Sequence, residues 1–139
     1  MAKSKYNNQK VEVEGIKFDS QVEARYHDQL KWLLANGEIL SFTLQPRYLL
    51  QEAFKKDGVT HRKTEYVADF EVLHIDRSIE VIDIKGQLLP VFSLKAKLFH
   101  KRYPHKLSLL NYSKIDGGWC ELSTILNNRK LRKKAKENK

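Results

Sequence analysis

The sequence predicts an α/β fold in which helices flank a central mixed β-sheet. Two runs of β-branched, aromatic and apolar residues, 66–73 and 79–86, are separated by a short polar segment and predict an antiparallel hairpin. A helix expected at 91–102 lies between this hairpin and a short apolar strand at 107–110. Because that strand follows a helical crossover, it should lie parallel to a neighbour through a right-handed connection.

The N-terminal part is expected to supply a small hairpin and the first helix. Residues 1–10 are polar and basic and are expected to be loose, and 11–18 alternate around a Glu-Gly turn. Ser20 and Glu23 stand at capping-box spacing, and the helix should end at the Asn-Gly pair 36–37. The apolar residues expected on its core face are Val22, Tyr26, Leu30, Leu33 and Leu34.

The rest of the chain predicts two long extended runs and a final helix. A strand is expected at 39–50, bent at its proline, and an extended run at 59–73 after a turn at 55–58. A Gly-containing turn is expected at 116–119, followed by a helix from about Ser123. Both tryptophans, Trp32 and Trp119, are expected in the core.

Length and composition are those of one globular domain, with 139 residues, 41% hydrophobic and 31% charged. Residues 1–122 are therefore expected to form a single domain, followed by a basic helix or tail at 123–139. No apolar run approaches a membrane span, no leader is visible, and the single Cys120 excludes an internal disulfide. A cytoplasmic protein without a membrane partner is expected, and the net charge of +9 favours nucleic acid as partner.

The predicted hairpin carries a candidate site. If its turn centres on Asp76, Asp69 lies directly opposite Asp83, and Lys85 points to the same face. Two facing carboxylates repel each other, so the arrangement makes sense if a cation lies between them. The alternative is a surface hairpin in which Lys85 merely neutralises Asp83, although two valines share that face.

These residues match a family pattern. Asp69, followed by Asp83-Ile84-Lys85 at the end of the next strand, resembles the signature of the PD-(D/E)XK nuclease superfamily, although Ala68 replaces the usual proline. The order helix, three strands, helix, strand is similar to that superfamily's restriction-endonuclease-like core. Over about residues 6–112 the chain more closely resembles small phage and prophage endonuclease-like proteins, and also the nuclease subunit of some transposition systems. That resemblance is carried by Gly15-Ile16-Lys17-Phe18-Asp19-Ser20, Glu23-Ala24, Tyr26, Leu44-Gln45-Pro46, Tyr66-Val67-Ala68-Asp69-Phe70 and Asp83-Ile84-Lys85-Gly86.

Phosphodiester hydrolysis needs a cation on the phosphate, a nucleophilic water and relief of charge on the leaving oxygen. Asp69 and Asp83 offer hard oxygen ligands for Mg²⁺ or Mn²⁺, and the resemblance implies that the backbone carbonyl of Ile84 also binds the metal. Lys85 could orient or deprotonate the attacking water, or neutralise the developing charge.

Two further residues have both a structural and a site interpretation. Glu23 is either the capping partner of Ser20 or, as the resemblance implies, a catalytic glutamate that holds a second metal or a metal-bound water, and it could do both. Gln45 could support the site from the preceding strand or be an ordinary strand residue.

Basic residues on the second helix and in the tail are candidates for contact with DNA phosphates, against the alternatives of a solvated face and a solubilising tail. They are Lys95, Lys97, Lys101 and Arg102 on the helix and Arg129, Lys130, Arg132, Lys133 and Lys134 in the tail. The five histidines show no metal-ligand spacing, so a zinc site is not expected.

The resemblance implies a Mg²⁺-dependent DNA endonuclease, a hydrolase that is phage encoded and works in the bacterial host cytoplasm. Its substrate would be branched or flapped DNA, as for a Holliday-junction resolvase in recombination or replication. A resolvase would act as a symmetric homodimer, for which the N-terminal hairpin is a candidate interface. The alternatives are a non-catalytic basic DNA-binding module and a nuclease subunit active only in a larger complex.

Overall fold

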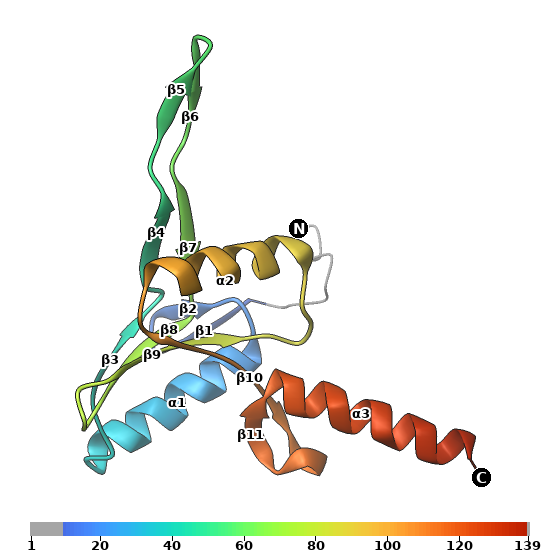
Figure 1. Cartoon of the computed structure of the whole chain (residues 1–139). Coiled ribbons are helices and arrows are strands. Elements are labelled where there is room, and N and C mark those ends of the chain that lie inside the picture. The colour runs from blue at the N-terminus through green and yellow to red at the C-terminus, as the bar shows by residue number, and fades with distance from the viewer. Residues whose placement is uncertain (1–9, 139) are drawn as a thin grey trace.

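The computed structural model describes residues 10–138, so the expected loose N-terminus lies almost wholly outside the described residues. The described chain is organised around a five-stranded mixed sheet in the order β11-β10-β9-β8-β3, accompanied by helices α1, α2 and α3 (Figure 1). The predicted α/β class with a central mixed sheet is confirmed. No helix within residues 10–138 is long and apolar enough to cross a membrane.

The N-terminal elements are those expected. Strands β1 (Val11–Val13) and β2 (Ile16–Phe18) pair across Glu14 and Gly15, whose φ angles are 54° and 81°. Positive φ at both turn residues is the geometry that favours tight hairpins. Helix α1 (Gln21–Ala35) begins after Ser20, whose Oγ accepts a hydrogen bond from the Glu23 N–H at 3.2 Å.

The apolar face of α1 is narrower than predicted. Tyr26 and Leu30 are buried, but Leu34 is 42% exposed and Trp32 is 58% exposed. Trp32 lies about 200° around the helix from Leu30 at about 3.6 residues per turn, and therefore on the outer side. The prediction that Trp32 is a core residue is wrong, whereas Trp119 packs, partly buried, against the core beside α1.

The central strands confirm the predicted pairing. β8 (Phe70–His74) and β9 (Ile79–Ile84) are antiparallel, and Phe70 lies opposite Ile82, as a turn centred on Asp76 requires. β3 (Ile39–Leu44) flanks β8. After α2 (Pro90–Arg102), β10 (Lys106–Ser113) returns parallel to β9, as expected for a strand that follows a helical crossover.

The two long extended runs are interrupted, and the interruptions create an arm, defined here as residues 47–67. The expected strand at 39–50 breaks after β3, because Gln45 adopts a φ of 48°, and continues as β4 (Arg47–Gln51). The expected run at 59–73 is three strands, β6 (Val59–His61), β7 (Thr64–Val67) and β8. β4 pairs with β7, and β5 (Phe54–Lys56) pairs with β6. Figure 1 shows the arm extending away from the sheet.

The C-terminal part contains a strand that the sequence analysis missed. A short 3₁₀ turn, η1 (Lys114–Asp116), is followed by β11 (Gly118–Glu121), which pairs antiparallel with β10. The expected turn at 116–119 is therefore too long at its C-terminal end, since only Gly117 remains between η1 and β11. Helix α3 (Leu122–Glu137) begins with Leu122 and Ile125 buried and then projects from the body.

The sheet separates two hydrophobic clusters. Phe70, Val72 and Ile82 face α1, together with Leu30 of that helix. Val81 faces the other way, toward Phe99 of α2. Because side chains alternate along a strand, β9 places Val81 and Asp83 on the α2 side.

Candidate functional site

The four residues predicted to carry the chemistry line one cleft of about 500 Å³. Glu23 comes from the first turn of α1, and Asp69 from the junction between the arm and β8. Asp83 lies near the end of β9, and Lys85 directly follows that strand. Residues separated by up to 62 positions in the sequence thus meet at the place where the arm leaves the sheet. The other lining residues are Asp19, Val67, Ile84, Gly86, Gln87 and Leu89.

Asp69 is held in place by the neighbouring strand. Its Oδ2 accepts a hydrogen bond from the Ile84 N–H at 2.7 Å, and its own N–H donates to the Ile82 carbonyl at 3.2 Å. Its carbonyl accepts a hydrogen bond from the Gln45 N–H at 2.9 Å. Contacts to the backbone of β9 and of Gln45, which directly follows β3, therefore fix Asp69 at the base of the arm.

Asp83 is the more deeply buried of the two strand acids, with 3% of its surface exposed. Tyr66 Oη donates a hydrogen bond to Asp83 Oδ2 at 2.6 Å, and Lys85 Nζ lies 3.6 Å from Asp83 Oδ1. The Lys85 ammonium also lies 4.6 Å from the ring centroid of Phe92. A carboxylate on one side and an aromatic face on the other hold this ammonium at the edge of the cleft.

The carboxyl groups perturb one another. Burial raises the pKa of Asp69, and the neighbouring Glu23 raises it further. Burial likewise raises the pKa of Asp83, as does the charge of Asp69, while Lys85 and Tyr66 act in the opposite direction. The cluster therefore contains more negative charge than its single ammonium offsets, and it favours a proton or another cation.

Asp69 couples the three carboxyl groups electrostatically. Glu23 raises the pKa of Asp69, and the charge of Asp69 raises the pKa of Asp83. Glu23 Oε2 accepts a hydrogen bond from the Asp19 N–H at 2.8 Å, so it caps α1 while it lines the cleft. Within residues 10–138, no three His, Cys, Asp or Glu side chains form a group that could hold a metal as they stand.

The donor chemistry nevertheless fits a hard divalent cation. Asp69 and Asp83 are neighbouring carboxylates in a polar cleft, and both pKa values are raised, first by burial and then by the neighbouring carboxyl groups. Mg²⁺ and Mn²⁺ prefer one or two carboxylates together with water and phosphate oxygens. Asp69 and Asp83 therefore form the core of a candidate metal site. Glu23 could join them as a ligand if its carboxylate turned away from the Asp19 N–H, from which it accepts a hydrogen bond at the start of α1.

Gln45 lies beside this site. It lines an adjoining pocket of about 230 Å³ that also contains Glu23 and Asp69. Its backbone contact to Asp69 and its positive φ make it the pivot at which the chain leaves β3. The structure thus brings Gln45 to the site region, as the site-supporting interpretation expects.

Two residues of the site were missed by sequence reasoning. Tyr66 looked like one of many strand aromatics, and Phe92 like an ordinary helix residue. Tyr66 lies three positions before Asp69. That spacing would put the two side chains on opposite faces of a regular strand, and no local pattern marks the irregular junction that brings both to one cleft.

The predicted DNA-contacting residues fall into three groups. Arg102 and Arg132 have structural partners: Arg102 Nη1 donates to the Leu50 carbonyl at 3.1 Å, and Arg132 Nη1 lies 2.9 Å from Asp116 Oδ1. Lys95 is half-buried. The remaining candidates are exposed: Lys97 and Lys101 on α2, and Arg129, Lys130, Lys133 and Lys134 on α3.

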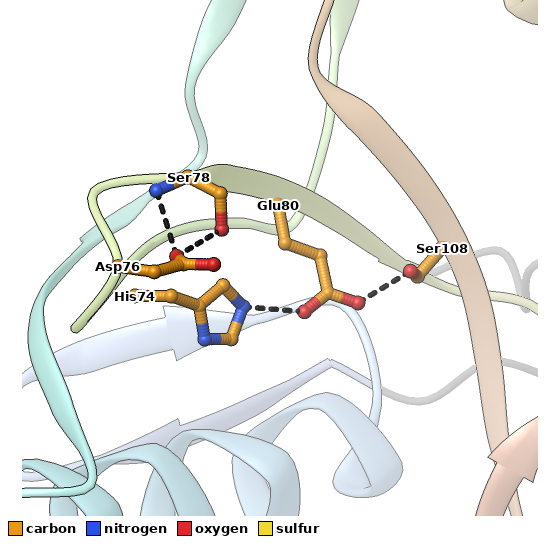
Figure 2. A network of polar contacts seen from close by, with 5 residues as sticks. All are labelled: His74, Asp76, Ser78, Glu80 and Ser108. Carbon is orange, nitrogen blue, oxygen red and sulfur yellow. Dashed lines mark hydrogen bonds and ion pairs between the residues drawn. The ribbon is translucent and has the colours of Figure 1, made fainter.

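A second polar cluster lies at the other end of the β8–β9 hairpin (Figure 2). His74 Nε2 lies 2.7 Å from Glu80 Oε1, and Ser108 donates a hydrogen bond to Glu80 Oε2. Glu80 therefore lies between the histidine and the serine, so His74 cannot activate Ser108 as a nucleophile. Asp76 accepts hydrogen bonds from the N–H and Oγ of Ser78 and closes the turn. These contacts have a structural role, because they stabilise the turn of the β8–β9 hairpin and its contact with β10.

The fold and the site define an α/β protein with a carboxylate and lysine cleft at the edge of its central sheet. Residues 3–117 match a family model described as "Protein of unknown function (DUF1064)", and the chain belongs to that family. The match includes all four cleft residues and ends before β11 and α3. No curated protein and no solved structure matches the chain.

Proposed function

We propose that the protein is a Mg²⁺-dependent DNA endonuclease with a restriction-endonuclease-like core. The observation that carries the proposal is the meeting of Asp69, Asp83 and Lys85 with Glu23 in one cleft. The order α1, β3, β8, β9, α2, β10, with β10 parallel to β9, supports it, because this is the order of elements in the resembled superfamily.

In this proposal Asp69 and Asp83 hold Mg²⁺ or Mn²⁺, with the Ile84 carbonyl and Glu23 as the further ligands that the resemblance implies. The bound ion would supply positive charge to the scissile phosphate. Tyr66 orients Asp83 through its hydrogen bond, and the Ile84 N–H orients Asp69. Lys85, whose side chain is 31% exposed, can reach a phosphate oxygen or the attacking water from its place at the cleft edge.

The substrate class follows from the resemblance and the charge. A net charge of +9 suits a polyanion, and the family likeness favours branched or flapped DNA in phage recombination or replication. A resolvase-like enzyme would present two such clefts in a homodimer. A non-catalytic DNA-binding module is the second candidate, because the carboxylates of the described residues do not form a ready metal-binding group.

Cleavage assays separate these candidates. Labelled four-way, flapped and linear DNA would be incubated with Mg²⁺ or Mn²⁺ and wild type, Asp83→Asn or Lys85→Ala. We expect metal-dependent cleavage by the wild type and a loss of about 10²-fold or more in each variant. Asp76→Asn is the matched control, since Asp76 lies in the turn at the far end of the same hairpin.

The non-catalytic module would be favoured if the wild type bound DNA but cleaved no substrate with any metal, as expected for Asp83→Asn. Cleavage that appears only when a host or phage extract is added would identify a subunit of a larger complex.

A further inference from the structure

The outer part of the arm is exposed along its whole length. Residues 51–63, called here the outer ribbon, are all exposed, and Figure 1 shows β5 and β6 lying beyond β4 and β7, away from the sheet and α2. The base of the arm is firmly held, because Arg102 and Tyr103 of the α2 end donate hydrogen bonds to the carbonyls of Leu50 and Leu49. A two-stranded ribbon without packing is marginally stable in water, so a ribbon held out from a firm base suggests a partner.

The outer ribbon is a regular structure rather than a loose loop. Lys56 lies opposite Val59 across a two-residue turn, Asp57-Gly58, whose φ angles are 52° and 76°. This is the turn geometry that matches the right-handed twist of a hairpin. Farther from the turn, the rings of Phe54 and His61 stack at 4.6 Å with an interplanar angle of 13°.

The charge of the ribbon points to a polyanion. From Gln51 to Lys63 there are four lysines and arginines and two acids, Glu52 and Asp57, of which Asp57 lies in the turn. Lys55 lies opposite Thr60 on one face of the ribbon, and the exposed Arg62 directly follows β6. Strands β5 and β6 themselves contain no carboxylate. B-DNA admits a two-stranded β-ribbon in its major groove, and lysine and arginine are the usual contacts to phosphates.

The position of the ribbon relates it to the cleft. β7 ends at Val67, which lines the cleft, and Asp69 follows two residues later. At about 3.3 Å per residue, Lys63 stands at most about 20 Å from Asp69 and the turn at most about 36 Å. One helical turn of B-DNA is also about 34–36 Å. A duplex with a phosphate at the cleft could therefore run beside the ribbon for up to one turn.

We propose that the outer ribbon is a second DNA contact, which binds duplex DNA at up to about one helical turn from the carboxylate cleft. The inference rests on the proposed function for the place of the cleft on the DNA. The contact itself is measurable without cleavage.

The test compares two variants with the same loss of charge. Lys55→Ala/Lys56→Ala/Arg62→Ala removes two lysines and one arginine from the outer ribbon, and all three side chains are exposed. Arg77→Ala/Lys106→Ala/Lys114→Ala removes the same residue types from exposed positions outside the arm. Binding to a fluorescent duplex of about 30 base pairs, about three turns, would be measured in EDTA over a range of salt concentrations.

We expect the ribbon variant to bind this duplex about tenfold or more weakly, with a salt slope shallower by roughly 2 to 3, because each lost phosphate contact contributes about 0.9 to the slope. The control variant should lose much less affinity for this duplex of about 30 base pairs than the ribbon variant.

A second variant guards against a local folding defect. Gln51 and Thr64 are direct partners in the ladder, so Asn-Gly can replace residues 52–63 as a two-residue turn. This shortened protein should lose affinity for the long duplex at least as strongly as the triple variant.

Three results would overturn the inference: wild-type affinity and salt slope in both ribbon variants, an equal loss in the control variant, or an equal loss on single-stranded DNA of the same length. The same experiments distinguish a failure of the ribbon inference from a failure of the proposed function. If the wild type never cleaves DNA but the ribbon variants lose duplex binding, only the nuclease proposal is wrong. If Asp83→Asn abolishes cleavage while the ribbon variants bind normally, only the ribbon inference falls.

Discussion

Tyr66 is the single residue that most changes the picture of the site drawn from the sequence. Its hydroxyl reaches Asp83 from the buried aromatic cluster beneath α2, where its ring packs against Phe92 and Phe99. Burial and the neighbouring Asp83 raise the pKa of Tyr66, so it remains a hydrogen-bond donor. It is a positioning residue, since it acts on the site through Asp83.

Tyr66→Phe should therefore weaken metal binding while leaving the fold intact. In the wild type, the hydrogen bond from Tyr66 lowers the pKa of Asp83. Without that bond, the Asp83 carboxyl group is harder to ionise. We expect a fall of about 10-fold to 100-fold in Mg²⁺ or Mn²⁺ affinity, larger at lower pH, measured by calorimetric titration. Tyr48→Phe is the control, because Tyr48 lies in the same cluster but donates to Glu71. Equal affinity in Tyr66→Phe and wild type at every pH would contradict the positioning role.

Asp69 and Asp83 should make the metal-free protein less stable as the pH rises. Their folded-state pKa values are raised above the ordinary 3.8, so the folded chain retains protons that the unfolded chain has released. The stability that the two protonated carboxyl groups contribute is fully present below pH 3.8 and is lost as the pH rises through their folded-state pKa values. Urea unfolding in EDTA from about pH 4 to about pH 9 should show the decline, and Asp83→Asn should flatten it. A decline as steep in the variant would mean that other groups cause it.

Leu30 and Trp32 should respond in opposite ways to truncation. Leu30 is fully buried at 0% exposure, and Leu30→Ala should cost about 2–5 kcal/mol. Trp32 is 58% exposed on the outer side of α1, and Trp32→Ala should change stability by about 0.5 kcal/mol or less. Urea unfolding measures both. A cost of several kcal/mol at Trp32 would restore the original expectation of a core tryptophan.

At the scale of elements, short-range sequence patterns correctly predicted the features that depend on neighbouring residues. The caps of α1, the hairpin of β1 and β2 and the register of β8 on β9 follow from short-range spacing, and all were predicted. The register mattered most, because it places the start of β8, just after Asp69, beside the end of β9, where Asp83 and Lys85 lie. The convergence of Glu23 was predicted by resemblance and not by any pattern in the sequence.

Local patterns were insufficient where the chain changes sheets. The runs 39–50 and 59–73 were each expected as one extended segment, the first bent at Pro46, yet both leave the central sheet at the Gln45 and Ala68 junction. Hydrogen bonds between segments distant in sequence hold this junction, including the one from the Ala68 N–H to the Pro46 carbonyl at 3.1 Å. β11 was missed because consecutive glycines, usual turn residues, stand at its start.

Asp116 shows how one residue joins three elements. Its carboxylate accepts hydrogen bonds from Ser113 Oγ at 2.5 Å and from Asn128 Nδ2 and Arg132 Nη1 at 2.9 Å. These bonds link β10 and η1 to α3 and lower the pKa of Asp116 to about 2. The stabilisation that they provide is present above the ordinary pKa of 3.8 and is lost as the pH falls toward 2.

Asp116→Asn should therefore destabilise the protein near neutral pH and remove part of its sensitivity to acid. Because the contacts fasten α3, the difference between variant and wild type should shrink between about pH 5 and about pH 3, as measured by urea unfolding. Arg129→Ala is the control, since Arg129 is an exposed arginine on the same helix. A constant difference at both pH values would show that the carboxylate charge does not matter.

At the scale of the whole molecule, the sheet and the arm differ in how they are packed. The sheet buries both of its faces, against α1 on one side and against Phe99 of α2 on the other, so it can fold on its own contacts. The arm shares only its base with this core, through Tyr48, Leu50 and Tyr66. The candidate site lies at the joint between the two, where a substrate could touch both.

This division predicts that stability and DNA binding can be separated. Replacing residues 52–63 with Asn-Gly removes only exposed side chains and closes the ladder at partners Gln51 and Thr64. Such surface changes alter stability by about 0.5 kcal/mol or less, so the midpoint and slope of urea unfolding should match those of the wild type. Tyr48→Ala, at the buried base, should instead cost about 3–5 kcal/mol, as for a large aromatic side chain in a core. If the shortened protein were destabilised as much as Tyr48→Ala, the outer ribbon would have to belong to the folding core, and its exposure would no longer indicate a partner.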